Sequence, residues 1–207
     1  MILPPAPGRW RGPGPFLSRG ISAVEMTLVL ALAATAVGLA APGVAHLRSS
    51  VSMRSAAGEV GAALHRARSL AISGGKNVGV KFRKNGDRYE WTIYGDGNGN
   101  GVRTTDIARG IDRPVASFPW GRNDVRPSIL TGFPVPDPGG AGFLDRLDDP
   151  IRFNGSDICS FSPVGESTPG SVYLWDGADR MAVVRVFGRS AKMRALYYRR
   201  GDGMWER

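Results

Sequence analysis

A long apolar run lies near the amino end of the chain, between Ala23 and Leu47. Glu25 is the one formally charged residue in this run, and it stands close to the beginning. A helix needs about 20 predominantly apolar residues to cross the hydrocarbon core of a bilayer, and the run has that length. We therefore predict a transmembrane helix over residues 21–47.

Beyond Leu47 the sequence becomes more polar, but apolar residues still recur three or four positions apart, as they do on one face of a helix. They are Val51, Met53, Ala57, Val60, Leu64, Ala67 and Ala71. This pattern predicts an amphipathic continuation of the same helix over residues 48–74, with one apolar stripe packed on a domain. We expect Gly74-Gly75 to end the helix, because glycine readily takes the left-handed conformation that follows many helices.

The period then changes from helix to strand, which predicts a β-rich globular domain over residues 75–207. The segments 78–82 and 89–94 flank Asn85-Gly86, a pair typical of a tight hairpin turn. Five more short strands are expected at 151–155, 158–163, 171–175, 181–187 and 192–198. Residues 119–150 follow neither period and are rich in Pro, Gly and Asp, so we interpret them as a long surface loop, or as a stretch that hides short strands. The expected fold class is α+β, with the long helix packed on a mainly antiparallel sheet.

The length of the chain, 207 residues, is enough for one core-forming domain beyond the helix. The net charge is +9, and residues 181–207 alone hold seven Lys or Arg and two acidic residues. The single cysteine, Cys159, excludes an internal disulfide and is most simply a buried strand thiol. The two histidines, His46 and His65, stand on the predicted helix without the spacing of a metal site or a nucleophile motif nearby. We therefore expect no enzymatic activity and no cofactor other than the calcium ion considered next.

The glycine-rich segment Gly95–Asp106 allows two interpretations. A dinucleotide loop is excluded, because its glycines cannot be placed as Gly-x-Gly-x-x-Gly and no helix pattern follows. Asp96, Asn98 and Asn100 alternate as the first ligands of a calcium loop do, with Asp106 as the closing acid. Asp106 comes one residue before the twelfth position, however, so that ligand is displaced. A flexible hairpin loop without metal is the interpretation we favour, and calcium is the alternative.

The start of the apolar run resembles the class III signal of type IV pilins and type II secretion pseudopilins. Gly20, Ile21 and Glu25 match its cleavage site and its glutamate, and Pro42 matches the proline that kinks the helix in that family. The resemblance implies that residues 1–20 are a leader, which prepilin peptidase removes between Gly20 and Ile21 before methylation of Ile21. A carboxylate at membrane depth is costly without a cation. The resemblance supplies one for Glu25, the free amino terminus of a neighbouring subunit in a filament.

Three later features resemble one branch of that family, the GspH/FimT group of minor pseudopilins and minor pilins. They are ARSLAI at 67–72, FSPVGES leading into SVYLW, and a final strand pair around Gly188-Arg189. The resemblance implies a minor pseudopilin of a type II secretion system, a structural subunit of the periplasmic pseudopilus that takes part in protein secretion. Its partners would be other pseudopilins, prepilin peptidase and the bacterial inner membrane. The protein would cross that membrane once, with a cytoplasmic amino end and a periplasmic domain.

The basic carboxyl end favours an alternative, a FimT-like minor type IV pilin that binds DNA for uptake in transformation. Lysine and arginine contact phosphates, and aromatic side chains stack on bases. The candidate DNA-binding residues are Arg185, Arg189, Lys192, Arg194, Arg199 and Arg200. Gly188-Arg189 matches the start of the Gly-Arg-x-Arg motif associated with DNA capture in that group, but Ala191 replaces its second arginine. Two alternatives stay open: a solvated basic edge that discourages strand pairing, and a monomeric membrane protein that keeps residues 1–20.

Overall fold

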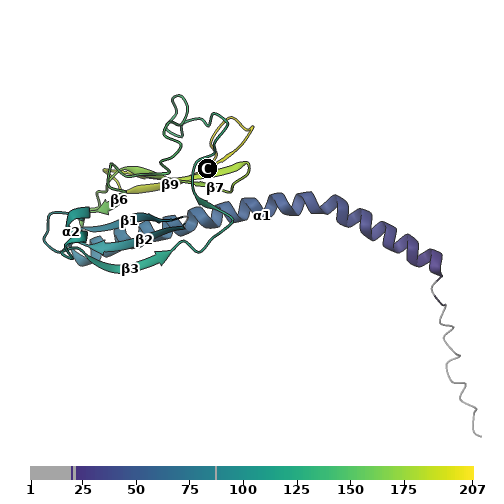
Figure 1. Ribbon diagram of the computed structural model, residues 1–207, viewed down its shortest axis with the longest axis horizontal. Helices are drawn as coiled ribbons and strands as arrows, with labels where there is room; N and C mark the ends of the chain where they lie inside the picture. Colours follow the sequence, from purple (N-terminus) through teal and green to yellow (C-terminus); the bar gives the residue numbers. More distant parts are fainter. Residues whose placement is uncertain (1–19, 21, 87) are drawn as a thin grey trace, which may run out of the picture. The chain divides into compact units, whose positions relative to one another are not determined.

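The computed structural model describes residue 20, residues 22–86 and residues 88–207 (Figure 1). The predicted leader up to Arg19, the predicted methylation site Ile21 and the side chains of 40–42 and 44–46 lie outside the described residues. The chain divides into two compact units, Met1–Val44 and Ala45–Arg207.

Helix α1 (Ala23–Gly74) is 52 residues long and includes most of both predicted helical segments. Ser22 caps its beginning, because the Val24 amide donates to the Ser22 hydroxyl at 3.3 Å and the Met26 amide donates to the Ser22 carbonyl at 3.1 Å. The first bond satisfies an N–H group that has no partner within the helix, and the second is the first backbone hydrogen bond of the helix. After the helix, Gly75 has φ +62°, the left-handed conformation expected at this end.

In the first unit, apolar side chains of α1 are exposed on all sides of the helix. They are Val24, Met26, Leu28, Val29, Leu30, Leu32, Val37 and Leu39. Among the described residues, no helical segment combines the length and the apolar character that crossing a bilayer requires. The membrane crossing of residues 21–47 therefore stays a prediction. Pro42 lies within α1, and the kink predicted there also stays a prediction.

In the second unit, α1 packs on the β-structure through one stripe of buried side chains, as the sequence predicted. The stripe consists of Met53, Ala56, Ala57, Val60, Ala63, Leu64, Ala67 and Ala71. Val51 is 65% exposed, so its predicted place on the stripe was wrong. Successive helical residues are rotated by about 100°, and Val51 therefore points almost away from the face of Met53, two residues later.

The first sheet has four antiparallel strands in the order β3-β2-β1-β6. They are β1 (Val78–Asn85), β2 (Arg88–Gly95), β3 (Arg113–Pro119) and β6 (Ile158–Phe161). The hairpin at Asn85-Gly86 is confirmed, because Asn85 pairs with Arg88 and Gly86 has φ +61°. Strand β3 was not predicted, because Pro114 and Pro119 are unusual in strands, but an edge strand tolerates proline.

The second sheet is antiparallel too and has the order β4-β7-β8-β9, with β5 also paired to β7. Its strands are β4 (Arg126–Pro127), β5 (Ile151–Arg152), β7 (Gly170–Trp175), β8 (Arg180–Phe187) and β9 (Lys192–Arg199). All five strands predicted after residue 150 are present in the two sheets. Strand β5 is shorter than predicted, because Asn154 takes φ +53° and interrupts the extended backbone. A helix with antiparallel sheets confirms the α+β class.

Two hydrophobic clusters form the main core. The first joins the buried stripe of α1 to residues of both sheets. The second lies on the other face of the second sheet, where Ile129, Leu130, Val135 and Leu144 cover Met181 and its neighbours. Figure 1 shows the loop between β4 and β5, which carries these four residues, lying over β7 and β9.

The interpretation of residues 119–150 as a surface loop was therefore only partly right. The segment contains the short strand β4 and buries four large apolar side chains on a sheet. Those side chains follow no regular spacing, so the sequence pattern did not reveal that they belong to a core. A second correction concerns α2 (Thr104–Ala108), a five-residue helix that follows the glycine-rich loop although the sequence predicted none.

Candidate functional site

The beginning of α1 presents Glu25 in the first turn of the helix. Gly20, Ser22 and the Glu25 side chain are exposed. The amide groups of a first helical turn carry partial positive charge, which stabilises a carboxylate there. This geometry leaves the Glu25 carboxylate accessible to a partner, as the predicted pairing with a neighbouring amino terminus requires. Cleavage after Gly20, methylation of Ile21 and that pairing stay predictions.

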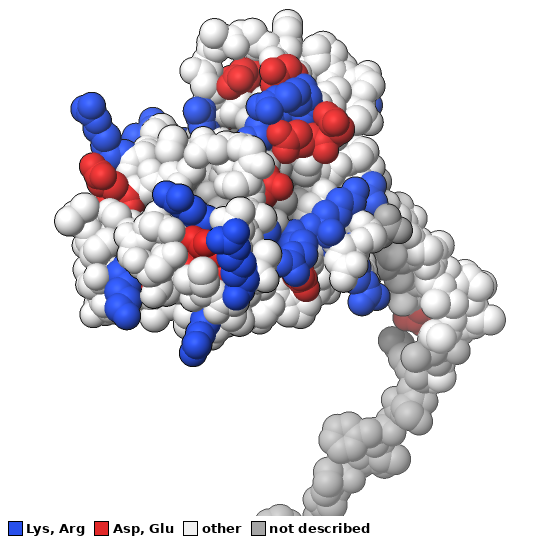
Figure 2. All heavy atoms as spheres, turned by 60° about the vertical axis from the view of Figure 1, so that its left-hand side comes forward, with Lys and Arg blue, Asp and Glu red and all other residues white. Residues whose placement is uncertain are grey.

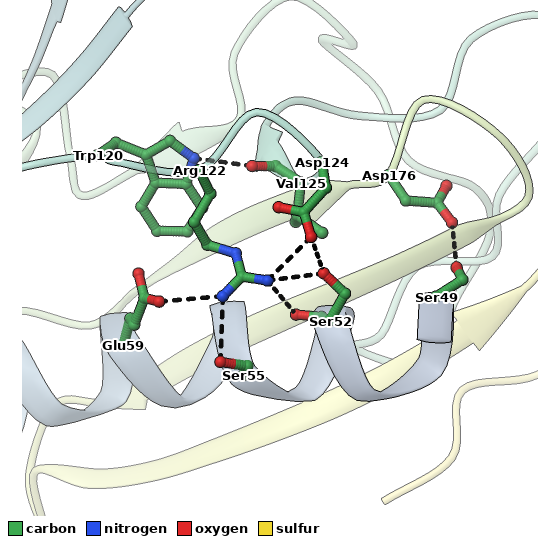
Figure 3. A network of polar contacts seen from close by, with 9 residues as sticks. All are labelled: Ser49, Ser52, Ser55, Glu59, Trp120, Arg122, Asp124, Val125 and Asp176. Carbon is green, nitrogen blue, oxygen red and sulfur yellow. Dashed lines mark hydrogen bonds and ion pairs between the residues drawn. The ribbon is translucent and has the colours of Figure 1, made fainter. Parts of the chain in front are cut away.

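A polar network further along α1, between Ser52 and Glu59, was not predicted from the sequence. We call it the Arg122 network; its members are Ser52, Ser55 and Glu59 of α1 together with Arg122 and Asp124 of the following loop (Figure 3). The three helical members are spaced by three and four residues, so they share one face of α1. Arg122 Nη1 donates to Ser55 Oγ and Glu59 Oε1, both at 3.1 Å. Arg122 Nη2 donates to Ser52 Oγ at 2.6 Å and to Asp124 Oδ2 at 3.0 Å.

Neighbouring contacts hold this network in place. The Ser52 hydroxyl donates to the Asp124 carboxylate, and this bond is the main cause that lowers the pKa of Asp124, while burial opposes it and Arg122 adds to it. The buried indole N–H of Trp120 donates to the Val125 carbonyl at 2.8 Å and so closes the loop. On the same side of α1, Ser49 donates to Asp176 at 2.8 Å, in the turn before β8 (Figure 3).

The network fastens α1 to the sheets by charged hydrogen bonds as well as by apolar packing. The members on α1 lie more than 60 residues from the members in the loop, as in the pair Ser55 and Arg122. No local pattern in the sequence could have indicated it.

The glycine-rich loop is organised by Asp96, which is only 6% exposed. Its carboxylate accepts hydrogen bonds from the backbone of Asn98, Gly99 and Gly101 and from the side chain of Asn77. Burial alone would raise the pKa of Asp96, but these hydrogen bonds outweigh burial and lower the pKa. The loop is thus held by N–H donors rather than being loosely attached.

The predicted calcium ligands do come together. The side-chain amides of Asn98 and Asn100 donate to Asp106 Oδ2 at 3.4 and 3.0 Å. Within the part of the chain that the structure describes, no group of three or more His, Cys, Asp or Glu residues is placed to hold a metal ion. Calcium binding by Asp96, Asn98, Asn100 and Asp106 stays a prediction.

The six candidate DNA-binding residues do not form one patch. Arg185 and Arg194 are direct partners across β8 and β9, and each guanidinium lies 5.7 Å from the centre of the Phe187 ring. Arg199 lies five residues beyond Arg194, so strand alternation places it on the opposite face. Figure 2 shows the Lys and Arg side chains of one face in several separate groups, some of them beside Asp or Glu.

Cys159 is fully buried in β6, and burial raises the pKa of its thiol. This confirms its interpretation as a strand thiol in the core. His65 is exposed on α1, and the side chain of His46 lies outside the described residues.

Comparison with known proteins gives one match. The family model described as type II transport protein GspH matches residues 56–188, more than half of the chain. No curated protein and no solved structure matches this chain. The matched region extends from the buried stripe of α1 through β8, and it includes Arg185 but ends before Arg189 and the four basic candidates after it. The chain therefore belongs to the GspH family, whose members are pseudopilins associated with other pseudopilins in type II secretion.

Proposed function

We propose that the protein is a minor pseudopilin, a structural subunit of the periplasmic pseudopilus in a type II secretion system. The observation that carries the proposal is the contrast along α1. One part of the helix is fastened to a globular unit of the GspH family, and the other part exposes apolar side chains. An apolar helix surface of this kind is buried in a bilayer or against other helices.

In this role the helix serves two environments in succession. It would first anchor the protein in the bacterial inner membrane, with the domain in the periplasm. Prepilin peptidase would cut between Gly20 and Ile21 and methylate Ile21. Within the filament, Glu25 would pair with the amino terminus of a neighbouring subunit, and the apolar side chains of α1 would pack against those of other pseudopilins.

A second candidate function is DNA binding by a FimT-like minor pilin. The Arg185–Arg194 pair beside Phe187 favours it, because two cations next to an aromatic ring can contact phosphates and a base of a single strand. The position of Arg199 on the opposite face of the sheet weighs against it.

A gene deletion distinguishes the two functions in one strain. If the proposal holds, loss of the protein stops secretion of the type II substrates and leaves DNA uptake unchanged, and the wild-type gene restores secretion. Normal secretion together with lost DNA uptake would reject the pseudopilin role. The double variant Arg185→Gln with Arg194→Gln extends the test. A strain that carries it should secrete normally if the Arg185–Arg194 pair has no part in assembly.

A further inference from the structure

A polar cavity of about 270 Å³ lies where α1 passes the ends of β8 and β9. It belongs to the second unit and lies apart from the Arg122 network. Its charged and hydroxyl-bearing lining includes Ser50 and Arg54 of α1, Arg180 and Arg199 of the sheet, and Asp202 and Glu206 of the last segment.

Three guanidinium groups converge on this cavity. Arg180 and Arg199 are direct partners across β8 and β9. Ala182 and Tyr197 lie two residues from them and pack with the cluster that contains α1, so strand alternation directs both arginines to the same face. From α1, Arg54 stacks on the Tyr197 ring at 4.6 Å and completes the group.

The positive charge of this group is only partly balanced, because three arginines face the two carboxylates of the lining, Asp202 and Glu206. Like charges placed directly opposite each other in a strand pair repel, which applies to Arg180 and Arg199. Among the described residues, Arg199 pairs with Asp202 at 4.0 Å, whereas Arg54 and Arg180 pair with no carboxylate. Arg180 Nε is also buried without a hydrogen-bond partner in the described part of the chain. Buried donors almost always have a partner, so Arg180 has an unmet donor and also lines the cavity.

We propose that this cavity binds a phosphate group, either free or in the headgroup of an anionic phospholipid. Guanidinium groups form paired, charge-assisted hydrogen bonds with phosphate oxygens. A tetrahedral phosphate can accept such bonds from three directions at once, which suits arginines on three elements better than a planar carboxylate does. The Ser50 hydroxyl adds a further donor to the same space.

The assignment of the phosphate to a phospholipid headgroup rests on the proposed anchoring of α1 in the membrane. Arg54 follows Leu47, the last residue of the predicted membrane segment, by seven residues, or about 10 Å along a helix. That distance places Arg54 near the headgroup layer of the bilayer. Binding of free phosphate does not depend on the proposed function.

The test uses the full-length protein in detergent and follows its thermal unfolding. Sodium phosphate should raise the midpoint temperature more than sodium chloride of equal ionic strength does. In Arg54→Gln and in Arg180→Gln, the half-saturating phosphate concentration should rise roughly tenfold, since each change removes a charge-assisted contact. Arg113→Gln removes one exposed cation from β3, outside the cavity, and should leave the response unchanged. Two variants on different elements keep the test valid if one of them fails to fold.

A second arm compares dihexanoyl phosphatidylglycerol with dihexanoylglycerol, which lacks the phosphate. Stabilisation by the phospholipid that depends on Arg54 and Arg180 would assign the site to a headgroup, and stabilisation by inorganic phosphate alone would assign it to a soluble phosphate. Equal effects of phosphate and chloride, or an unchanged response in both cavity variants, would overturn the proposal. Neither arm involves secretion or filament assembly, so failure here leaves the pseudopilin role to its own test.

Discussion

At the scale of single residues, Arg122 does most to connect the helix to the loop that follows β3. Its side chain is 19% exposed and donates to three residues of α1 and to Asp124 in its own loop. Hydrogen bonds that involve a charged group contribute about 1.5–3 kcal/mol each, and removing one partner leaves the others unsatisfied. Arg122 is therefore more important for stability than an exposed arginine of the same domain.

Replacing Arg122 by glutamine should lower the free energy of unfolding by about 2–3 kcal/mol, because Glu59 and Asp124 lose their counter-charge. Urea unfolding followed by tryptophan fluorescence measures this, since Trp120 lies beside the network. Arg83→Gln is the matched control, because Arg83 is 52% exposed and forms one pair with Glu90 at 3.8 Å. An exposed pair contributes about 0–1 kcal/mol. Equal losses in both variants would show that the network adds nothing specific.

Asp96 provides a pH-dependent prediction. Its pKa is lowered in the folded protein, so its contribution to stability is complete above the unfolded value, about 3.9, and is lost as pH falls through the folded value. The unfolding free energy should therefore fall as pH decreases from about 5 to 3, and Asp96→Asn should show a weaker dependence. Exposed Asp148 gives the control variant Asp148→Asn, which should keep the wild-type slope.

The same samples test the calcium alternative. If N–H donors alone organise the loop, the unfolding midpoint at neutral pH will be the same in EDTA and in millimolar calcium. A calcium-dependent increase that Asp96→Asn abolishes would instead establish a metal site.

At the scale of elements, local sequence patterns predicted well what local interactions determine. The 3.6-residue period, Gly74-Gly75 and Asn85-Gly86 act within a few residues, so the sequence indicated α1 and the β1–β2 hairpin. Strand β3 depends on pairing with β2, whereas Ile129, Leu130, Val135 and Leu144 depend on packing against the second sheet, and proline and glycine obscure any period in both segments. The Arg122 network and the arginine cavity likewise join segments that only the fold brings together.

Glu25→Ala tests the role of α1 in assembly. The variant should still insert in the membrane, because removing a carboxylate lowers the free-energy cost of inserting the apolar segment. It should co-purify with the other pseudopilins several-fold less than the wild type, because the neighbouring amino terminus loses its counter-charge. Thr27→Ala, which changes a nearby polar residue and keeps the charge, should assemble normally. Normal co-purification of Glu25→Ala would remove the role given to this carboxylate.

At the scale of the whole molecule, the protein combines a helix with an uncovered apolar surface and a globular unit of the GspH family. The sequence predicted both parts and their order along the chain. The structure adds how the second part of the helix is held by the sheets, through a buried stripe and the Arg122 network. These contacts would keep the domain attached to the helix when the helix packs against other subunits.

The mass and amino-terminal sequence of the protein isolated from membranes test the central claim most directly. The pseudopilin account predicts that the mature chain starts at N-methylated Ile21 and lacks residues 1–20. Replacing Gly20 by alanine should give the uncut chain from the same strain as a reference. A wild-type chain that keeps Met1 would contradict processing by prepilin peptidase and, with it, the assembly role proposed for Glu25.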